Sequence, residues 1–387
     1  MGTVIAVGLL LVGGLLQLTL GAIDWQLLSS PVNLILLLII LLALGVSYAL
    51  RKRIYAVAWA MTQYAAVPAI VCGVAVTLVM GLTGWDAMLQ SWPLVLSYAW
   101  MMAIVGWVAI DRAVRLCTGR SVRQSRIVTF TSLLNHAGLF LAMVCGTLGN
   151  ADMQRLHMTV RVGHPERFAV DVMGQGLVHP LPLSIQLHRF TIDQYPPQYA
   201  IIDNATGQVL ADAPWQVAQD TLLEFSTPRT VGDGYEASGQ VGACTAAFVT
   251  ATPLAEAEAS AMTEATAQVQ GWVSCGSFMH PYSVLPLTGQ HSLVMLEPEP
   301  RRYASEVTVS TADGQTVDAV IEVNRPLEVD GWKVYQLSYD QTLGRWSDVS
   351  VFELVRDPWL PWVYAGIYML LAGAVLTFLI HQPKPRS

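Results

Sequence analysis

The sequence predicts a polytopic α-helical membrane protein, with about six transmembrane helices and a large extracytoplasmic β-rich domain between the last two helices. Hydrophobic residues make up 53% of the 387 residues and charged residues only 13%, whereas a soluble domain has about 25% charged residues. Six apolar runs are long enough to cross a bilayer, which takes roughly 18 residues or more. A long polar segment lies before the last run, and its apolar residues alternate as they do in strands.

The six apolar runs cover most of both ends of the chain. We expect the first run to be retained, because no basic residues precede it and it has the length of a membrane helix rather than of a cleaved signal peptide. The third run is the least uniform, since it contains Gln63, Tyr64 and Pro68. The runs are Thr3–Ala22, Pro31–Leu50, Met61–Leu82, Pro93–Ile110, Ile127–Gly149 and Trp359–Ile380.

Basic residues predict the orientation, because Lys and Arg collect in cytoplasmic loops. Ten of them follow the second, fourth and sixth runs: Arg51, Lys52, Arg53, Arg112, Arg115, Arg120, Arg123, Arg126, Lys384 and Arg386. With both termini in the cytoplasm all ten lie inside. The opposite loops, Ile23–Ser30 and Thr83–Trp92, contain neither Lys nor Arg. The segment Asn150–Asp357 then lies outside.

The outer segment resembles an antiparallel β domain tethered at both ends. Apolar residues alternate in SEVTVSTADGQTVDAVIEVN on both sides of Asp313–Gly314, which predicts a hairpin. Similar alternation occurs in ERFAVDVMG, IQLHRFTIDQY, QYAIIDNATGQVL, WKVYQLSYD and DVSVFELV. Pro253–Gln270 is rich in Ala and Glu and is predicted to be a helix.

Several classes of function are disfavoured by what the sequence lacks. Residues 150–357 contain 25 acidic and 11 basic residues, which argues against nucleic acid as a partner because phosphate contacts need clustered cations. The chain has no glycine-rich phosphate loop, no CxxCH, no CxxC and no HExxH. These absences disfavour a nucleotide-binding enzyme, a c-type cytochrome, a thioredoxin-like protein and a zinc protease.

Two of the five cysteines, Cys244 and Cys275, lie in the outer segment, where disulfides persist. A structural disulfide between them is the simplest interpretation. The alternatives are a transient thiol pair that handles a substrate cysteine, and a separate buried thiol at each position.

His136 is the most unusual residue, because it lies inside the fifth apolar run. At 1.5 Å per residue it is about 13 Å from Ile127 and about 20 Å from Gly149, near the midplane on the inner half. Ionisable groups in a membrane usually face the bundle interior. The alternatives are an interhelical hydrogen bond, a proton relay and axial ligation of haem iron. No other histidine lies in an apolar run, so a two-histidine haem site would take its second ligand from a partner.

Tryptophans near the outer boundary form a second group: Trp25, Trp85, Trp92, Trp359 and Trp362. An aromatic belt at the level of the lipid headgroups is the simpler interpretation. A flat aromatic shelf for a porphyrin is the alternative for one or two of them.

The C-terminal part resembles the ResB family, also called CcsB. The resemblance is carried by VNRPLEVDGWKVYQLSYD and by the stretch through the last apolar run, and also by SLLNHAGLFLAMVCGTLGNADMQRL. It extends from about Ala56 to Phe378 and is weakest from Met173 to Met295. Its main matching residues are Asn324, Pro326, Tyr335, Gln336, Tyr339, Asp340, Asp357 and Pro358.

The resemblance implies a fold and a role. Members of this family act in System II cytochrome c biogenesis with CcsA (ResC), a membrane protein with a tryptophan-rich WWD motif that is absent here. The implied plan is a three-helix core at 56–149, a periplasmic β-rich domain at 150–357, and a last helix with a cytoplasmic tail at 358–387. Residues 1–55 would be two additional helices. The location is the bacterial inner membrane.

The resemblance also makes haem b, as transient cargo, the favoured ligand of His136. The implied function is to carry haem across the membrane and deliver it, reduced, for attachment to the CxxCH thiols of an apocytochrome c. Thiol-reducing proteins are further candidate partners. The chain would be a non-catalytic or co-catalytic subunit of a haem lyase complex. Two alternatives are a membrane-anchored β-domain scaffold or sensor without haem, and a transporter for another solute.

Overall fold

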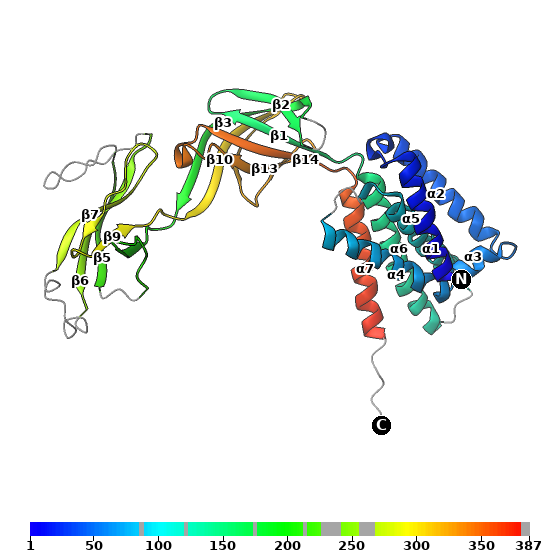
Figure 1. The fold of residues 1–387 in the computed structure, drawn as a ribbon. Coiled ribbons are helices and arrows are strands. Elements are labelled where there is room, and N and C mark those ends of the chain that lie inside the picture. The colour runs from blue at the N-terminus through cyan, green and yellow to red at the C-terminus, as the bar shows by residue number, and fades with distance from the viewer. Residues whose placement is uncertain are drawn as a thin grey trace. The chain divides into compact units, whose positions relative to one another are not determined.

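The computed structural model describes residues 1–84, 89–119, 123–172, 176–211, 215–225, 241–254 and 268–380. The chain divides into two compact units (Figure 1). Unit 1 comprises Met1–Gln154 and Arg356–Ser387, and unit 2 comprises Arg155–Val355.

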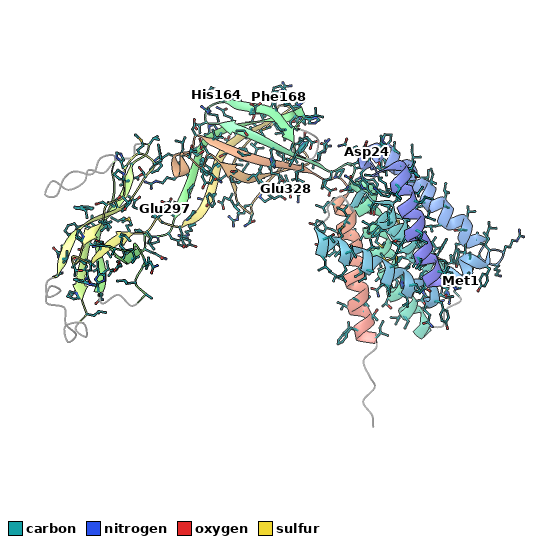
Figure 2. All side chains as sticks on the ribbon, viewed as in Figure 1. Met1, Asp24, His164, Phe168, Glu297 and Glu328 are labelled. Atoms are coloured by element: carbon teal, nitrogen blue, oxygen red, sulfur yellow. The ribbon has the colours of Figure 1, made fainter. Side chains whose placement is uncertain are left out.

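Unit 1 is helical. Figure 2 shows Met1 and Asp24 at opposite ends of its first helix. The helices are α1 (Gly2–Leu20), α2 (Val32–Ala49), α3 (Tyr55–Ala60), α4 (Gln63–Thr83), α5 (Trp92–Cys117), α6 (Arg123–Gly149) and α7 (Leu360–Ile380), with a short 3-10 turn at Trp25–Leu28. Within the described part of the chain, six helices (all but the short α3) are long and apolar enough to cross a membrane. The six predicted spans are therefore confirmed as apolar helices.

Helices α6 and α7 approach closely because glycines face each other. A Cβ on Gly138 would lie 2.6 Å from the carbonyl oxygen of Gly366, and a Cβ on Gly366 would lie 2.6 Å from the carbonyl oxygen of Gly138. Gly373 of α7 leaves room for the Asn135 side chain, which donates to Thr377 Oγ1 at 3.3 Å. Small residues let membrane helices pack with their backbones in contact, so this helix pair has little tolerance for added volume.

The carboxylate of Asp152 joins three segments at one end of unit 1. It accepts hydrogen bonds from the Ser30 backbone N–H, from Asn33 Nδ2 and from Trp359 Nε1, each at 2.7 Å. Burial alone would raise the pKa of Asp152, but these donors outweigh that effect and hold its pKa below the ordinary value. The carboxylate thereby ties the start of α2 and the approach to α7 to the end of α6.

Helix α5 continues beyond the fourth predicted span, from Ile110 to Cys117. The further turns contain the buried Asp111, which accepts from Tyr48 Oη at 3.0 Å and pairs with Arg115 at 2.7 Å.

Within its described residues, unit 2 contains three β-sheets. The largest has the strand order β11-β10-β3-β2-β1-β14-β13-β12, and the two smaller sheets have the orders β4-β9-β8 and β5-β6-β7. The strands of the first half are β1 (Gln154–Arg161), β2 (Pro165–Asp171), β3 (Val178–Gln194), β4 (Tyr199–Asp203), β5 (Trp215–Phe225), β6 (Cys244–Pro253) and β7 (Val269–Gly276). Those of the second half are β8 (Leu285–Pro286), β9 (His291–Met295), β10 (Pro300–Thr311), β11 (Thr316–Glu322), β12 (Leu327–Val329), β13 (Trp332–Tyr339) and β14 (Val349–Arg356).

Each part of unit 2 has its own buried cluster. Met158, Ile185 and Phe352 lie in the core on the eight-stranded sheet. Val249 of one small sheet and Leu293 of the other lie in a second core between those sheets. The long strands β3 and β10 extend from the large sheet towards the small ones (Figure 1).

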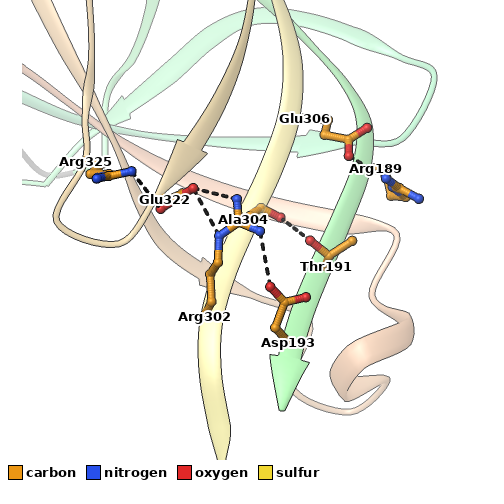
Figure 3. Close-up of polar contacts among 8 residues, drawn as sticks. All are labelled: Arg189, Thr191, Asp193, Arg302, Ala304, Glu306, Glu322 and Arg325. Atoms are coloured by element: carbon orange, nitrogen blue, oxygen red, sulfur yellow. Dashed lines mark hydrogen bonds and ion pairs between the residues drawn. The ribbon is translucent and has the colours of Figure 1, made fainter. Parts of the chain in front are cut away.

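Ion pairs lie on the exposed face of β3, β10 and β11 (Figure 3). Arg302 contacts Glu322 at 2.5 Å and Asp193 at 3.2 Å, and Arg189 contacts Glu306 at 2.5 Å. Hydrogen bonding from Arg302 lowers the pKa of Glu322. Because these groups are exposed, they contribute to strand register more than to stability.

The predicted hairpin is confirmed: β10 and β11 pair from Ala304–Glu322 to Ser310–Thr316, and Gly314 at the turn has φ +85°. The helix predicted over Pro253–Gln270 is wrong at its ends, because Pro253 closes β6 and Val269–Gln270 open β7. Cross-strand pairing with neighbouring apolar strands outweighs helix propensity there. Residues 255–267 of that prediction lie outside the described residues.

We predict that Gly366→Ala destabilises unit 1 by about 1–3 kcal/mol, because the added methyl group meets the α6 backbone. Gly146→Ala on α6 is the control, since nothing lies within 4 Å of its added Cβ. Thermal unfolding of the purified full chain in detergent should show a lower midpoint for Gly366→Ala only. Equal midpoints for both variants would contradict close packing at this glycine.

We predict that Asp152→Ala lowers the free energy of unfolding by about 2 kcal/mol or more, because charge-assisted hydrogen bonds are lost and the buried Asn33 amide loses an acceptor. The folded-state pKa of Asp152 lies below the unfolded value of about 3.9, so its contribution is present above that pH and is lost as the pH falls through the folded-state pKa. Melting curves across acidic pH check this, with exposed Glu328→Gln as control. Asp152→Asn has no titratable group at this position. If its stability fell with decreasing pH as steeply as that of the wild type, the prediction would be wrong.

Candidate functional site

His136 is a half-buried residue of α6. It directly follows Asn135, whose side chain packs against Gly373 of α7. Its Nδ1 is 2.7 Å from the backbone carbonyl oxygen of Ser132 and 3.5 Å from the Ser132 hydroxyl. A carbonyl oxygen only accepts, so Nδ1 carries the proton of the neutral ring. Nε2 then has the free lone pair, and no polar partner at Nε2 occurs in the described part of the chain.

This arrangement is that of an available metal ligand. Metal-binding histidines commonly donate their other ring N–H to a backbone carbonyl, which orients the ring and increases its basicity. The described residues contain no group of three or more His, Cys, Asp or Glu side chains that could hold a metal ion. His136 can therefore supply one axial ligand to a porphyrin iron, and among the described residues it belongs to no group of three or more such side chains.

The level of His136 along the helix bundle can be derived from a nearby contact among α2, α5 and α6. A Cβ on Gly106 of α5 would touch Leu44 of α2 at 2.8 Å and Phe140 of α6 at 2.9 Å. His136 precedes Phe140 by four residues, Tyr48 follows Leu44 by four, and Asp111 follows Gly106 by five. Because α6 runs opposite to both α2 and α5, His136 lies at about the level of the Tyr48–Asp111 hydrogen bond.

Most residues of the ResB-like signature have architectural roles. Asn324 has φ +66° in the turn between β11 and β12, and Pro326 lies two residues after it. The backbone N–H groups of Trp359 and Leu360 donate to Asp357 Oδ1 at 3.0 Å, so Asp357 and Pro358 start α7. Within the described part of the chain, the contacts of these residues shape a turn and the start of a helix.

The other signature residues belong to β13 and its end. Buried Gln336 accepts from Ser305 Oγ at 2.6 Å and donates to the Ser338 carbonyl at 2.9 Å, while Tyr335 pairs in register with Glu353. Asp340 accepts from the Thr342 hydroxyl at 2.6 Å, and this bond lowers the pKa of Asp340.

Tyr339 is the signature residue that lines a cleft. Its ring stacks on Phe190 and Tyr303, with centroids 5.0 and 5.7 Å apart. The cleft, of about 620 Å³, is also lined by Cys275, Phe278, Glu297, Arg345 and Trp346. Glu297 is labelled in Figure 2. We call this the Tyr339 cleft. Arg345 lies over the Trp346 ring at 4.3 Å and pairs with Glu224 at 2.7 Å, so the cleft has aromatic walls and charges of both signs.

Cys244 and Cys275 lie in the paired strands β6 and β7, and both are free thiols in the structure. Cys244 is 0% exposed, and Cys275 lines the Tyr339 cleft. Burial raises the pKa of both thiols, and the nearby Arg345 lowers it less. A raised pKa disfavours the thiolate that attacks a disulfide. A bond between the two stays a prediction.

The tryptophans of the predicted belt make hydrogen bonds within unit 1. Trp25 Nε1 donates to the Leu89 carbonyl and Trp92 Nε1 to the Gly21 carbonyl, each at 3.1 Å, and Trp359 donates to Asp152. Trp362 is exposed, and Trp85 lies outside the described residues. These partners are consistent with a belt, and the porphyrin shelf stays a prediction.

Sequence reasoning missed a cationic cavity at the junction of α2, α3 and α5. It used the basic residues at the ends of α2 and α5 only to assign orientation. Their convergence on one cavity needed the Tyr48–Asp111 hydrogen bond, which joins residues 63 positions apart. Of the basic residues used for orientation, Arg120, Lys384 and Arg386 lie outside the described residues.

We predict that the outer thiols react slowly with N-ethylmaleimide in the native protein, because burial raises the pKa of both. Exposed Cys117 is the internal control and should be modified first. Cys275 should follow as the pH is raised above about 8.5, the pKa of an ordinary thiol, and Cys244 only after unfolding. Mass spectrometry of labelled peptides measures this order. A disulfide would instead leave both unmodified after unfolding until a reductant is added.

Comparison with known families finds one match. The model of the ResB-like family matches residues 290–347, from β9 through β13 and the 3-10 turn at Gly344–Trp346. The match includes Asn324, Tyr339 and part of the Tyr339 cleft, but not His136. No curated protein matches the chain. The match over residues 290–347, together with the signature residues within it, supports an assignment to the ResB/CcsB family.

Proposed function

We propose that this protein is a subunit of a System II cytochrome c synthase. In this role it helps to carry haem across the bacterial inner membrane and to deliver it, reduced, to CxxCH apocytochromes together with a CcsA-like WWD partner. The ResB-like match suggests involvement in cytochrome c biogenesis. The observation that carries the haem-specific part is the His136 imidazole, whose Nδ1 is held by the Ser132 carbonyl while Nε2 has no partner among the described residues.

Haem is the cargo that suits this imidazole. A neutral histidine with a free Nε2 lone pair is a common axial ligand of haem iron. A polar side chain inside an apolar helix is costly unless it has a partner or a function. His136 provides one axial position, so the second ligand would come from the partner protein or from a transient small ligand. This arrangement favours transfer over permanent binding.

The attachment reaction requires no redox step from this chain. Each thioether forms when an apocytochrome S–H adds across a haem vinyl group: the sulfur bonds to one carbon, the proton goes to the other, and no electrons are gained or lost overall. The contribution expected of this protein is positioning and exclusion of water. The absence of a clear acid–base pair in the described residues is compatible with that contribution.

The Tyr339 cleft is the part of unit 2 best suited to hold a segment of the apocytochrome. It lies partly within the matched stretch, and Tyr339 and Trp346 provide apolar surface there. Arg345 and Glu297 add charges that can fix the direction of an extended peptide. Docking at this cleft would keep substrate thiols on the outer side of the membrane.

The second candidate is a membrane-anchored scaffold or sensor that binds no haem. It is favoured by the architectural roles of most signature residues, such as Asn324, Gln336 and Asp357. The two candidates differ in whether covalent haem in the cell depends on the His136 ring.

We predict that deletion of the gene abolishes covalent haem in c-type cytochromes, and that complementation with His136→Ala restores little of it, because the iron loses its axial ligand. Haem staining of denatured membrane and periplasmic proteins measures this, at expression matched by immunoblot. Added imidazole should partly restore staining in the His136→Ala strain, because it can occupy the position left by the ring.

His179→Ala is the matched control, since His179 is an exposed histidine on β3. It should restore wild-type staining. Loss of staining on deletion together with normal staining in His136→Ala would keep the biogenesis role and reject haem ligation by His136. Unchanged staining on deletion, in a strain without a second copy of the gene, would reject the proposed function.

A further inference from the structure

The cationic pocket is an open cavity of about 630 Å³ at the junction of α2, α3 and α5. Its charged lining residues are Arg51, Lys52, Arg53, Arg112, Arg115 and Asp111. Five cations thus surround a single carboxylate, and they come from two segments far apart in sequence. The fold concentrates positive charge here without a matching number of acidic groups.

The one carboxylate is already engaged. Asp111 is 8% exposed, accepts from Tyr48 Oη at 3.0 Å and pairs with Arg115 Nε at 2.7 Å. Arg112 Nη1 is farther from it, at 3.8 Å. Asp111 therefore positions the α5 arginines at the cavity wall and neutralises at most one of them.

The basic residues of the cationic pocket have hydrogen-bonding capacity that no described residue uses. Within the described residues Arg112 Nε is buried and has no hydrogen-bond partner. Arg51, Lys52 and Arg53 make no ion pair with any described residue. Arg51 instead lies over the Tyr48 ring at 3.9 Å and donates to the Tyr48 carbonyl at 2.9 Å, which holds its guanidinium in place. Unpaired, oriented guanidinium groups bind carboxylate and phosphate oxygens well.

The inner wall of this pocket and His136 lie at a similar depth. Tyr48 and His136 lie four residues, and Asp111 five residues, from the contact of Leu44, Gly106 and Phe140, all towards the same end of the helices. Along a helix one turn corresponds to about 5.4 Å. An amphipathic ligand whose apolar body lies in the bundle at the level of His136 would therefore present its anionic end at the depth of the arginines.

We propose that the cationic pocket binds the anionic end of an amphipathic, membrane-soluble ligand through its oxyanions. Carboxylates of a porphyrin and the phosphate of an anionic lipid headgroup share this chemistry. The porphyrin assignment rests on the proposed function, in which haem enters near His136, and the two propionates of haem are the groups to be bound. The oxyanion site itself does not depend on that function.

The test uses the purified full chain in phosphatidylcholine nanodiscs and the iron-free probe protoporphyrin IX. This probe has both propionates but cannot bind the His136 ring through iron. Its dimethyl ester lacks the carboxylates and is the ligand control. Fluorescence titration should show binding of protoporphyrin IX, at least tenfold weaker binding of the ester, and weaker binding at high salt.

The protein variant is Arg51→Gln/Arg112→Gln, which removes two oriented donors. It should weaken protoporphyrin IX binding by tenfold or more, because hydrogen bonds between charged groups are stronger than those between neutral groups. Arg51→Lys/Arg112→Lys keeps the charge and should recover part of the affinity, which separates ligand binding from misfolding or altered orientation. Arg167→Gln in unit 2 is the matched control and should bind as wild type.

Phosphatidylglycerol in the nanodiscs distinguishes the two sources of oxyanion. If it leaves protoporphyrin IX binding unchanged, the porphyrin assignment is supported. If it displaces the probe from wild type but has no further effect on the Gln variant, the oxyanion site is supported and its porphyrin assignment is overturned. If the Gln variant binds the probe as tightly as wild type, the pocket proposal is wrong, whatever the haem stain of the His136→Ala strain shows.

Discussion

The close approach of α6 and α7 is the constraint on which the rest of unit 1 depends. Gly138 and Gly366 leave no room for a side chain between the two backbones. This contact holds α6 in place, and α6 in turn carries His136 at a defined depth. In a lipid environment, where apolar surface gains nothing from leaving water, such backbone contact and the polar link from Asn135 to Thr377 are the main forces that hold helices together.

His136 and the cationic pocket bring polar groups into a mainly apolar bundle at about the same level. The imidazole lies within the apolar helix α6, whereas Arg51 follows the end of α2 and Arg112 lies in the last turns of α5. Asp111 connects these two segments, because it accepts a hydrogen bond from Tyr48 of α2 and pairs with Arg115 of α5.

Much of this could be predicted from sequence, since apolar runs and alternating strands are local patterns. The six long helices, the hairpin at Gly314 and the position of His136 in an apolar helix all followed from such patterns. The Tyr48–Asp111 hydrogen bond did not, because it joins residues 63 positions apart in the sequence. The strands at Pro253 and Val269 were missed because pairing partners, which are not visible locally, outweighed composition. The contacts of the signature residues could not be predicted, because their sequence does not distinguish a turn or a cap from a binding group.

The three residues that donate hydrogen bonds to Asp152 are translated at different times. Ser30 and Asn33 precede the carboxylate along the chain, whereas Trp359 follows it after the whole β-rich unit has been translated. Until the last helix emerges, Asp152 has only part of its hydrogen-bond complement, and the glycine face of α6 has no partner. Maturation of the bundle is therefore coupled to completion of the polypeptide, and a chain truncated before α7 would present both defects to cellular quality control.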